Sequence, residues 1–206
     1  MKAIFLILIM TTFSLFAQKN NTPASASNNL ETITLGGGCY WCVEAVYENL
    51  MGVKSVVSGF SGGKTIDPSY EEVSSGRTGH AESVQITYDK SITNLDEIFK
   101  VFFTVHDPTT LNRQGADEGT QYRSVIFYKN EQQKLAAQSI IAALKKAKVY
   151  DDPIVTTLEP FTKFYKAEAY HQNYYQNNKN QPYCQMVIQP KIAKFEKIFK
   201  NRLKKK

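Results

Sequence analysis

The alternation of apolar and polar residues along the chain predicts a mixture of strands and helices. Residues 82–88 (ESVQITY) alternate cleanly and form the clearest strand, because successive strand residues point to opposite faces of a sheet. Residues 40–50 instead repeat their apolar positions at helical spacing and precede Gly52, a typical helix stop. The same criteria predict strands over 32–35, 53–60, 124–128 and 154–158, and helices over 95–103, 131–146, 169–178 and 191–203.

The order of these elements predicts the fold class. Strands and helices mix without a regular strand–helix–strand cadence, which favours an α+β fold over a doubly wound sheet. We expect a single domain with a mixed central sheet and flanking helices. A chain of 206 residues, 42% of them hydrophobic, is long enough to bury a sizeable core.

The N-terminus has the pattern of an export signal. Residues 1–17 join Lys2 to an apolar run that ends at Ala17 and is short for a membrane span. Leu15 lies where a cleavage site prefers a small residue, so retention as an N-terminal tether is the alternative to cleavage. Residues 18–30 are polar and predict a flexible leader before a folded domain over 31–206. The protein is therefore expected to be exported, either periplasmic or secreted.

Net charge changes this picture little. The formal charge is +6, and much of the excess lies in the tail over residues 191–206. No Arg-rich strip with interleaved aromatic residues accompanies it, so we expect no nucleic-acid partner. A solvated basic helix is favoured over the tail of a surface-binding module, and nothing in the sequence demands more than a monomer.

Three cysteines follow the leader: Cys39, Cys42 and Cys184. An odd number in an exported chain leaves at least one thiol outside any intramolecular bridge, which in an oxidising compartment suggests a redox role. Cys39 and Cys42 also form a CxxC pair, typical of a thiol–disulfide oxidoreductase or of half a metal site. The sequence has no second CxxC or paired-His motif to complete a zinc site, so no metal is expected.

Cys39 has the surroundings of a nucleophile. It follows a run of glycines and begins the predicted helix over residues 40–50, where unpaired backbone N–H groups favour a thiolate and lower the thiol pKa. Tyr40 and Trp41 beside it could form an aromatic wall for a small apolar group such as a thioether methyl. This combination favours a reactive thiol over a buried structural cysteine.

Two further segments carry polar candidates. Glu82 follows a glycine-bounded turn at the entrance of the clearest strand, where burial could raise its pKa and let it act as a general acid. His80, in the same turn, is expected to be structural. Residues 106–124 (HDPTTLNRQGADEGTQYRS) form a long polar stretch typical of functional loops. The candidates in this stretch are Asp117, Gln121, Tyr122 and Arg123.

Four motifs in order, GGCYW, GHAE, HDPTTLNRQGADEGTQYRS and AEAYHQNY, resemble the methionine sulfoxide reductase A family over residues 34–190. The resemblance implies the family's fold, which is related to the ferredoxin-like fold, over the domain at 31–206. It also implies a peptide-methionine (S)-S-oxide reductase, which reduces the S epimer of methionine sulfoxide, free or in proteins and peptides. Such an enzyme would repair oxidised proteins.

The resemblance also implies roles for individual residues. Cys39 would attack the sulfoxide sulfur and be left as a sulfenic acid. Protonated Glu82 would hand a proton to the sulfoxide oxygen. Tyr70 and Tyr122 would hydrogen-bond that oxygen, and Asp117 would support the site.

The same resemblance places the methyl pocket and the resolving thiols. Tyr40, at the family's usual Phe position, and Trp41 would hold the substrate methyl group. Cys184 is expected to resolve the sulfenic acid first; Cys42, where many members carry Gly, is the alternative, because a bridge to Cys39 within one helical turn is strained. A relay through both is a further alternative.

No bound cofactor is implied, because an external thioredoxin-like dithiol would reopen the disulfide. The competing activity is that of an exported CxxC thiol–disulfide oxidoreductase, which would need neither Glu82 nor a methyl pocket.

Overall fold

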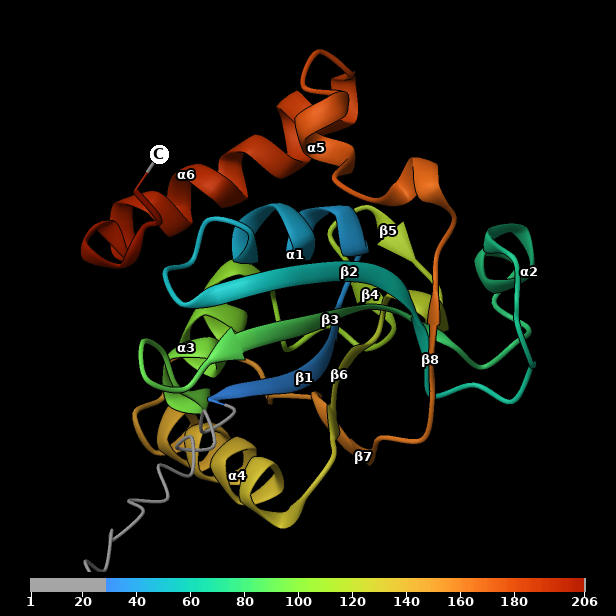
Figure 1. Ribbon diagram of the computed structural model, residues 1–206. Helices are drawn as coiled ribbons and strands as arrows, with labels where there is room; N and C mark the ends of the chain where they lie inside the picture. Colours follow the sequence, from blue (N-terminus) through green and yellow to red (C-terminus); the bar gives the residue numbers. More distant parts are fainter. Residues whose placement is uncertain (1–28, 206) are drawn as a thin grey trace, which may run out of the picture.

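The computed structural model describes residues 29–205 (Figure 1). The predicted signal segment and most of the predicted leader lie outside the described residues. The first strand, β1, begins at Leu30, two residues before the strand expected over 32–35. Within residues 29–205 no helix is both long and apolar enough to cross a membrane.

A six-stranded mixed sheet forms the centre of the domain. Its strand order is β7-β6-β1-β3-β2-β8, and β6 and β7 form the one parallel pair of this sheet. The inner strands β6-β1-β3-β2, with two crossover helices, have the β-α-β-β-α-β arrangement of the ferredoxin-like motif. The predicted α+β class and mixed sheet are confirmed. The strands are β1 (Leu30–Gly37), β2 (Val53–Ser61), β3 (Ala81–Asp89), β6 (Ser124–Tyr128), β7 (Thr157–Pro160) and β8 (Phe164–Lys166).

Helices flank this sheet, and α1, α5 and α6 lie together on one side of it in Figure 1. Three helices start where the sequence provides a capping side chain: Ser69 accepts from the backbone of Glu72, Asn94 from that of Glu97, and Asn130 from that of Gln133. The helices are α1 (Tyr40–Tyr47), α2 (Tyr70–Ser74), α3 (Leu95–Val105), α4 (Glu131–Lys146), α5 (Tyr174–Asn177) and α6 (Gln189–Ile198).

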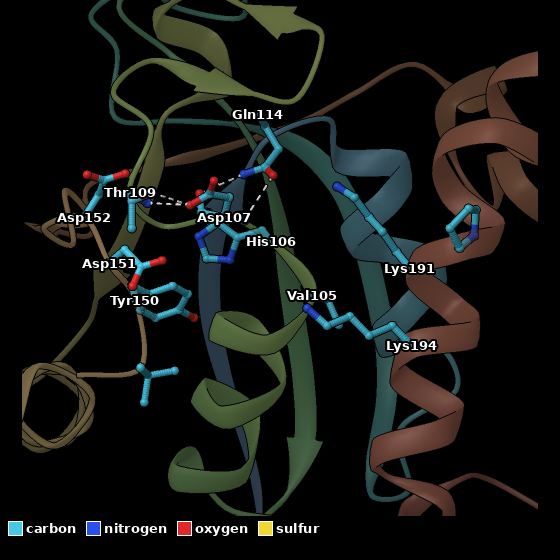
Figure 2. A pocket seen from close by; sticks show the side chains of 12 residues that line it. Val105, His106, Asp107, Thr109, Gln114, Tyr150, Asp151, Asp152, Lys191 and Lys194 are labelled. Atoms are coloured by element: carbon cyan, nitrogen blue, oxygen red, sulfur yellow. Dashed lines mark hydrogen bonds between the residues drawn. The ribbon is translucent and has the colours of Figure 1, made fainter. Parts of the chain in front are cut away.

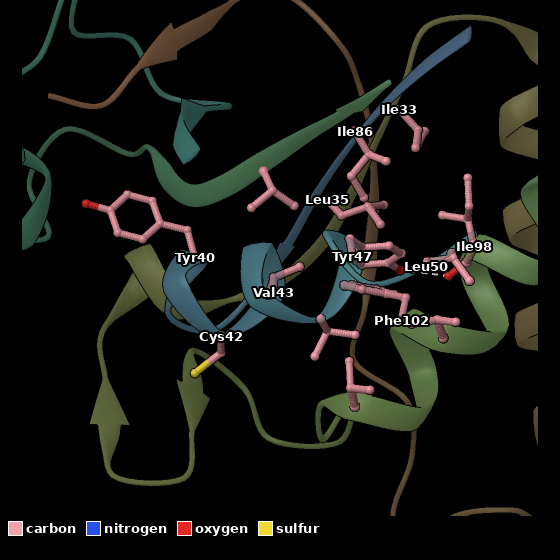
Figure 3. Close-up of a cluster of buried hydrophobic side chains, with 14 of the residues drawn as sticks. Ile33, Leu35, Tyr40, Cys42, Val43, Tyr47, Leu50, Ile86, Ile98 and Phe102 are labelled. Atoms are coloured by element: carbon pink, nitrogen blue, oxygen red, sulfur yellow. Dashed lines mark hydrogen bonds between the residues drawn. The ribbon is translucent and has the colours of Figure 1, made fainter. Parts of the chain in front are cut away.

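The core lies between the sheet and helices α1 and α3. Ile33 and Ile86 are register partners on β1 and β3, and both are fully buried. Figure 3 shows them in one cluster with Tyr47 of α1 and Phe102 of α3. The Tyr47 hydroxyl donates to the carbonyl of Ile98 at 2.7 Å, which satisfies the one polar atom of this side chain and ties α1 to α3. The helix that carries Cys39 at its start is therefore held by a closely packed interior.

Two boundary predictions are corrected. The strand expected over 154–158 is β7 at Thr157–Pro160, because the preceding residues bond to a loop instead: Val155 N–H donates to the carbonyl of Pro108. The helix expected over 191–203 begins earlier, with a π-helical turn at Cys184–Ile188 that runs into α6, and it ends at Ile198.

The residues after α6 pack back onto the fold instead of continuing the expected helix to 203. The Arg202 guanidinium pairs with Glu97 of α3, with Nη2 at 2.6 Å from Oε2. The backbone of Arg202 accepts from Met51 at 2.8 Å, and Lys204 N–H donates to Asn49 at 2.9 Å. These bonds fix the C-terminal residues to the turn between α1 and β2.

Candidate active site

Cys39 is the N-cap residue of α1, one position before the first helical turn on which it was expected. Its φ of −56° and ψ of 125° are not helical, and its side chain is only 6% exposed. Gly38 before it has a φ of +86°, and a Cβ there would lie 2.5 Å from Cγ of Gln114. Glycine is therefore required for both the backbone turn and the close packing that present Cys39 at this point.

Glu82, near the start of β3, lies beneath the N-terminus of α1. Its Oε2 accepts a hydrogen bond from the backbone N–H of Tyr40 at 3.1 Å, and the side chain is 2% exposed. Burial raises the pKa of Glu82 to about 8, although the bond from Tyr40 opposes the rise; the charge of Asp117 adds to it. The carboxyl group is therefore largely protonated at neutral pH.

The thiols of Cys39 and Cys42 influence each other's pKa. Burial raises the pKa of Cys39 well above its ordinary value, and the bond to Cys42 and the charge of Glu82 contribute to the rise. The hydrogen bond from Cys39, supported by Lys191, lowers the pKa of Cys42 against the effect of its own burial. The proton of the pair therefore stays on Cys39.

The predicted lowering of the Cys39 pKa is wrong for this resting site. The backbone N–H of Tyr40, which could have faced a thiolate, is bonded to Glu82 instead. Without that donor, the cost of a charge in a buried position decides the direction of the shift.

Tyr70 and Tyr122 approach the same centre from two other elements. Tyr70, expected in a loop, is the first residue of α2, and Tyr122 ends the 3-10 turn Thr120–Tyr122. Burial raises the pKa of both phenols, and the charges of Glu82 and Cys39 raise both further. Both hydroxyl groups therefore keep their protons at neutral pH and can donate hydrogen bonds.

Asp117 reaches the cysteine pair through a residue that sequence reasoning missed. It lies on the short strand β5 (Asp117–Glu118), which pairs with β4 (Arg113–Gln114). Its Oδ2 accepts from the hydroxyl of Tyr183 at 2.8 Å, and that hydroxyl oxygen lies 3.8 Å from Sγ of Cys42. The one sequence signal that could have identified Tyr183 is its position directly before Cys184. In the structure Cys184 is fully buried at the start of the π-helical turn.

Tyr40 and Trp41 form the predicted aromatic wall, and two unpredicted residues complete it. The rings of Tyr40 and Trp41 lie 6.0 Å apart between centroids. Trp41 stacks on Tyr174 with centroids 3.6 Å apart and an interplanar angle of 7°, and its Nε1 donates to Nδ1 of His171 at 3.2 Å. Both new residues belong to the AYHQNY segment, which the sequence marked as a motif without assigning it a contact.

Three polar residues near these motifs have structural contacts instead. Gln121 donates from its side chain to the carbonyl of Ser74, and Arg123 donates to the carbonyl of Gly79. His80, as expected, is satisfied within the fold: Nδ1 accepts from Gly63 N–H at 3.0 Å and Nε2 lies 2.8 Å from the carbonyl oxygen of Thr65.

A cleft of about 580 Å³ separates the first turns of α6 from the end of α3 (Figure 2). It contains neither Cys39 nor Glu82, and burial lowers the pKa of its His106 to about 4, so that this imidazole is neutral. Within the described part of the chain, no group of three or more Cys, His, Asp or Glu could hold a metal ion. The lining residues are Val105, His106, Asp107, Thr109, Gln114, Val149, Tyr150, Asp151, Asp152, Pro190, Lys191 and Lys194.

Known proteins are similar to this chain in sequence and in fold. Residues 31–203 match a family model described as peptide methionine sulfoxide reductase. The chain is 55% identical over 174 residues to peptide methionine sulfoxide reductase MsrA 1 of Rhodopirellula baltica, an alignment that covers 84% of this chain and 90% of the relative. Mxr1 from Saccharomyces cerevisiae in reduced form has a TM-score of 0.70 at 32% identity, covering 77% of this chain and 91% of its own. Methionine sulfoxide reductase A of Corynebacterium diphtheriae has a TM-score of 0.67 at 34% identity, covering 78% and 80%.

Proposed function

Because this chain belongs to the peptide methionine sulfoxide reductase family and is an oxidoreductase that reduces methionine sulfoxide, we propose that Cys39 is its nucleophile and Glu82 its general acid. One observation carries this assignment: a protonated carboxyl group lies beside a buried thiol at the start of α1. A sulfoxide is a poor electrophile, and protonation of its oxygen is the activation that it needs.

The two neutral groups allow the reaction to proceed without leaving an isolated buried charge. The sulfur of Cys39 attacks the sulfoxide sulfur while Glu82 transfers its proton to the sulfoxide oxygen. The carboxylate that results takes the thiol proton of Cys39, whose pKa its charge raises. The new sulfur–sulfur bond and the sulfur–oxygen bond of the substrate then break as the hydroxyl group moves to the sulfur of Cys39. Cys39 is left as a sulfenic acid, so the thiol is oxidised by two electrons and the sulfoxide is reduced to methionine.

The surrounding side chains bind the substrate. The protonated hydroxyl groups of Tyr70 and Tyr122 donate to the sulfoxide oxygen, and the rings of Tyr40 and Trp41 hold the methyl group. Asp117 supports the site by holding the hydroxyl of Tyr183. With the methyl group and the oxygen each bound at a fixed side, the site accepts one configuration at sulfur, which we infer to be the S epimer.

Reduction of the separate epimers tests this function. Excess reduced enzyme, without added reductant, is mixed with each epimer of a methionine sulfoxide peptide, and the methionine formed is measured by chromatography. We expect methionine from the S epimer alone, and none from enzyme whose thiols have been alkylated. If the folded, reduced protein converts neither epimer, the assignment fails and the exported CxxC oxidoreductase becomes the leading alternative.

We further propose that Cys42, rather than Cys184, resolves the sulfenic acid first, which reverses the order expected from the sequence. The expected strain applies to two cysteines within one helical turn, but Cys39 is a non-helical N-cap residue, and Cys42 is near enough to shift the pKa of its thiol. Cys42 is also the more acidic thiol of the pair, and the thiolate is the attacking species. Its attack forms the Cys39–Cys42 disulfide and releases water.

Serine variants separate the two orders of resolution. After one turnover, Cys42→Ser should accumulate a Cys39 sulfenic acid that a sulfenic-acid reagent captures, with disulfide formation slowed by about 10²-fold or more. Cys184→Ser should form the Cys39–Cys42 disulfide at close to the wild-type rate, as shown by peptide mapping. The opposite pattern, with the sulfenic acid trapped only in Cys184→Ser, would restore the order expected from the sequence.

We propose that the cycle is completed by exchange. The buried thiol of Cys184 lies close enough to Cys42 for the charge of Cys42 to raise its pKa. Its attack on Cys42 transfers the disulfide to Cys42–Cys184 and frees Cys39. A thioredoxin-like dithiol then reduces this bridge, and no bound prosthetic group is required. We also infer that the enzyme is exported, from the apolar run at residues 1–17. The monomer expected from the sequence stays a prediction.

A further inference from the structure

Glu44 is a buried carboxyl group that the reaction does not use. It lies on α1, three residues after Trp41, and is 1% exposed. Its Oε2 accepts from the backbone N–H of Tyr174 at 3.3 Å, while Oε1 has no hydrogen-bond partner among the described residues. Burial raises the pKa of Glu44 to about 7, against hydrogen bonds to the backbone of Asn173 and Tyr174. Burying a carboxyl group with one oxygen unbonded lowers the stability of the fold, so its presence here suggests a function.

The segment that Glu44 holds carries the contacts of Trp41. Asn173 has a left-handed backbone with a φ of 52°, and this turn aims Tyr174 back towards α1. The ring of Tyr174 then lies flat on the indole of Trp41. In Figure 1 the short helix α5, which Tyr174 begins, packs beside α1.

The opposite end of this segment is fixed by Gln172. Its side chain accepts from Ser58 N–H at 3.0 Å and donates to the carbonyls of Ser58 and Ala167. Gln172 thus anchors the segment to β2. On the α1 side, Trp41 itself bonds to His171, and Glu44 holds the backbone N–H of Tyr174. Without the bond from Glu44, the ring of Tyr174 loses the contact that fixes its own backbone to α1, and its stacking on Trp41 contributes only about 0.5–1.5 kcal/mol.

We propose that Glu44 is a positioning residue for the methyl pocket: its carboxyl group fixes the backbone at Tyr174, and the Tyr174 ring fixes the indole of Trp41. The part of this inference that concerns substrate rests on the proposed function, because it takes Trp41 to contact the methyl group. The part that concerns the orientation of the indole does not depend on catalysis.

Trp41 is the one tryptophan in the sequence, so intrinsic fluorescence reports on this ring alone. Glu44→Met keeps the volume of the side chain but removes the acceptor. We expect its Trp41 emission to shift to longer wavelength and to be quenched more readily by acrylamide. The KM for methionine sulfoxide should rise by about 5- to 20-fold while kcat changes by less than about threefold, because a lost positioning bond weakens binding of substrate and transition state alike.

Two variants serve as controls for this effect. Glu44→Gln retains an acceptor for Tyr174 N–H and should stay within about twofold of the wild type in KM. Glu48→Met changes the glutamate at the C-cap of α1, whose carboxyl group does not accept from Tyr174 N–H, and should leave the emission unaltered. If Glu44→Met does not fold, Glu44→Gln carries the test, since a rise in its KM comparable to that expected of Glu44→Met would overturn the hydrogen-bond account.

A double-mutant cycle tests the route from Glu44 to Trp41. Tyr174→Ala removes the stacked ring, so adding Glu44→Met to it should raise KM no further. Additive effects of the two substitutions would show that Glu44 does not act through Tyr174. Unchanged emission in folded Glu44→Met would refute the positioning role even if the proposed reaction proved wrong, because fluorescence requires no turnover.

Discussion

Replacing Cys39 with Ser is expected to abolish the reduction of methionine sulfoxide, with a single-turnover rate at least about 10⁴-fold below that of the wild type. A serine hydroxyl is a far weaker nucleophile towards sulfur than a thiol, and its oxygen cannot accept the substrate oxygen as the sulfur of a sulfenic acid does. The loss should therefore persist with any reductant. It is measured as methionine formed from the S epimer by excess enzyme.

The same assay on Cys42→Ser and Cys184→Ser provides matched controls. Both should still form methionine in the first turnover, because neither thiol receives oxygen from the substrate in the proposed sequence of steps. Equal melting temperatures would show that the Cys39 variant is folded. The competing assignment makes Cys42 the nucleophile, because it is the more acidic of the two thiols. Turnover that survives in Cys39→Ser and disappears in Cys42→Ser would make Cys42 the nucleophile.

The raised pKa values of Cys39 and Glu82 have one physical origin. Both groups lie in a buried site, so the protein keeps each of them neutral until a substrate arrives. An acidic thiol beside a carboxylate would have placed two negative charges together. The neutral arrangement supplies a proton to the sulfoxide and a recipient for the thiol proton from the same carboxyl group.

The elements that the sequence predicts well are those with strong local patterns. The helix expected over 131–146 is α4 at Glu131–Lys146, and the strand expected over 124–128 is β6 at Ser124–Tyr128. The helix has apolar residues at helical spacing, and the strand is a continuous apolar run between polar ends. Strand β8 was missed because its three residues are strand only through pairing with β2, more than 100 residues earlier.

The residues of the site also differ in whether the local sequence marks them. Cys39 and Glu82 stand beside glycine-rich turns that mark them in the sequence. Tyr183 and Glu44 carry no such mark, because their roles arise from contacts with Asp117, 66 positions away, and Tyr174, 130 positions away. The pKa of Cys39 was mispredicted for a related reason: a helix N-terminus is visible in the sequence, but the carboxyl group that occupies it is not.

Glu82→Gln is expected to lower the rate of the chemical step by about 10²- to 10⁴-fold, the usual contribution of a general acid. Glutamine preserves the shape of the side chain and still offers an oxygen to the N–H of Tyr40, so α1 should keep its start. The amide has no proton to give to the sulfoxide oxygen. Pre-steady-state measurement of methionine formation tests this, and a rate within threefold of the wild type would remove Glu82 from the role of acid.

The pH dependence of the same step distinguishes loss of the acid from a general disturbance of the site. Because the pKa of Glu82 is raised to about 8, the active protonated form is present below that pH and is lost as the pH rises through it. The wild-type rate should therefore fall above pH 8, by about tenfold per unit once the pH is well beyond the pKa. The residual rate of Glu82→Gln should lack this decline. If the variant shows the same decline, the titrating group is another one, and the pair of Cys39 and Cys42 is the next candidate to be examined by serine substitution.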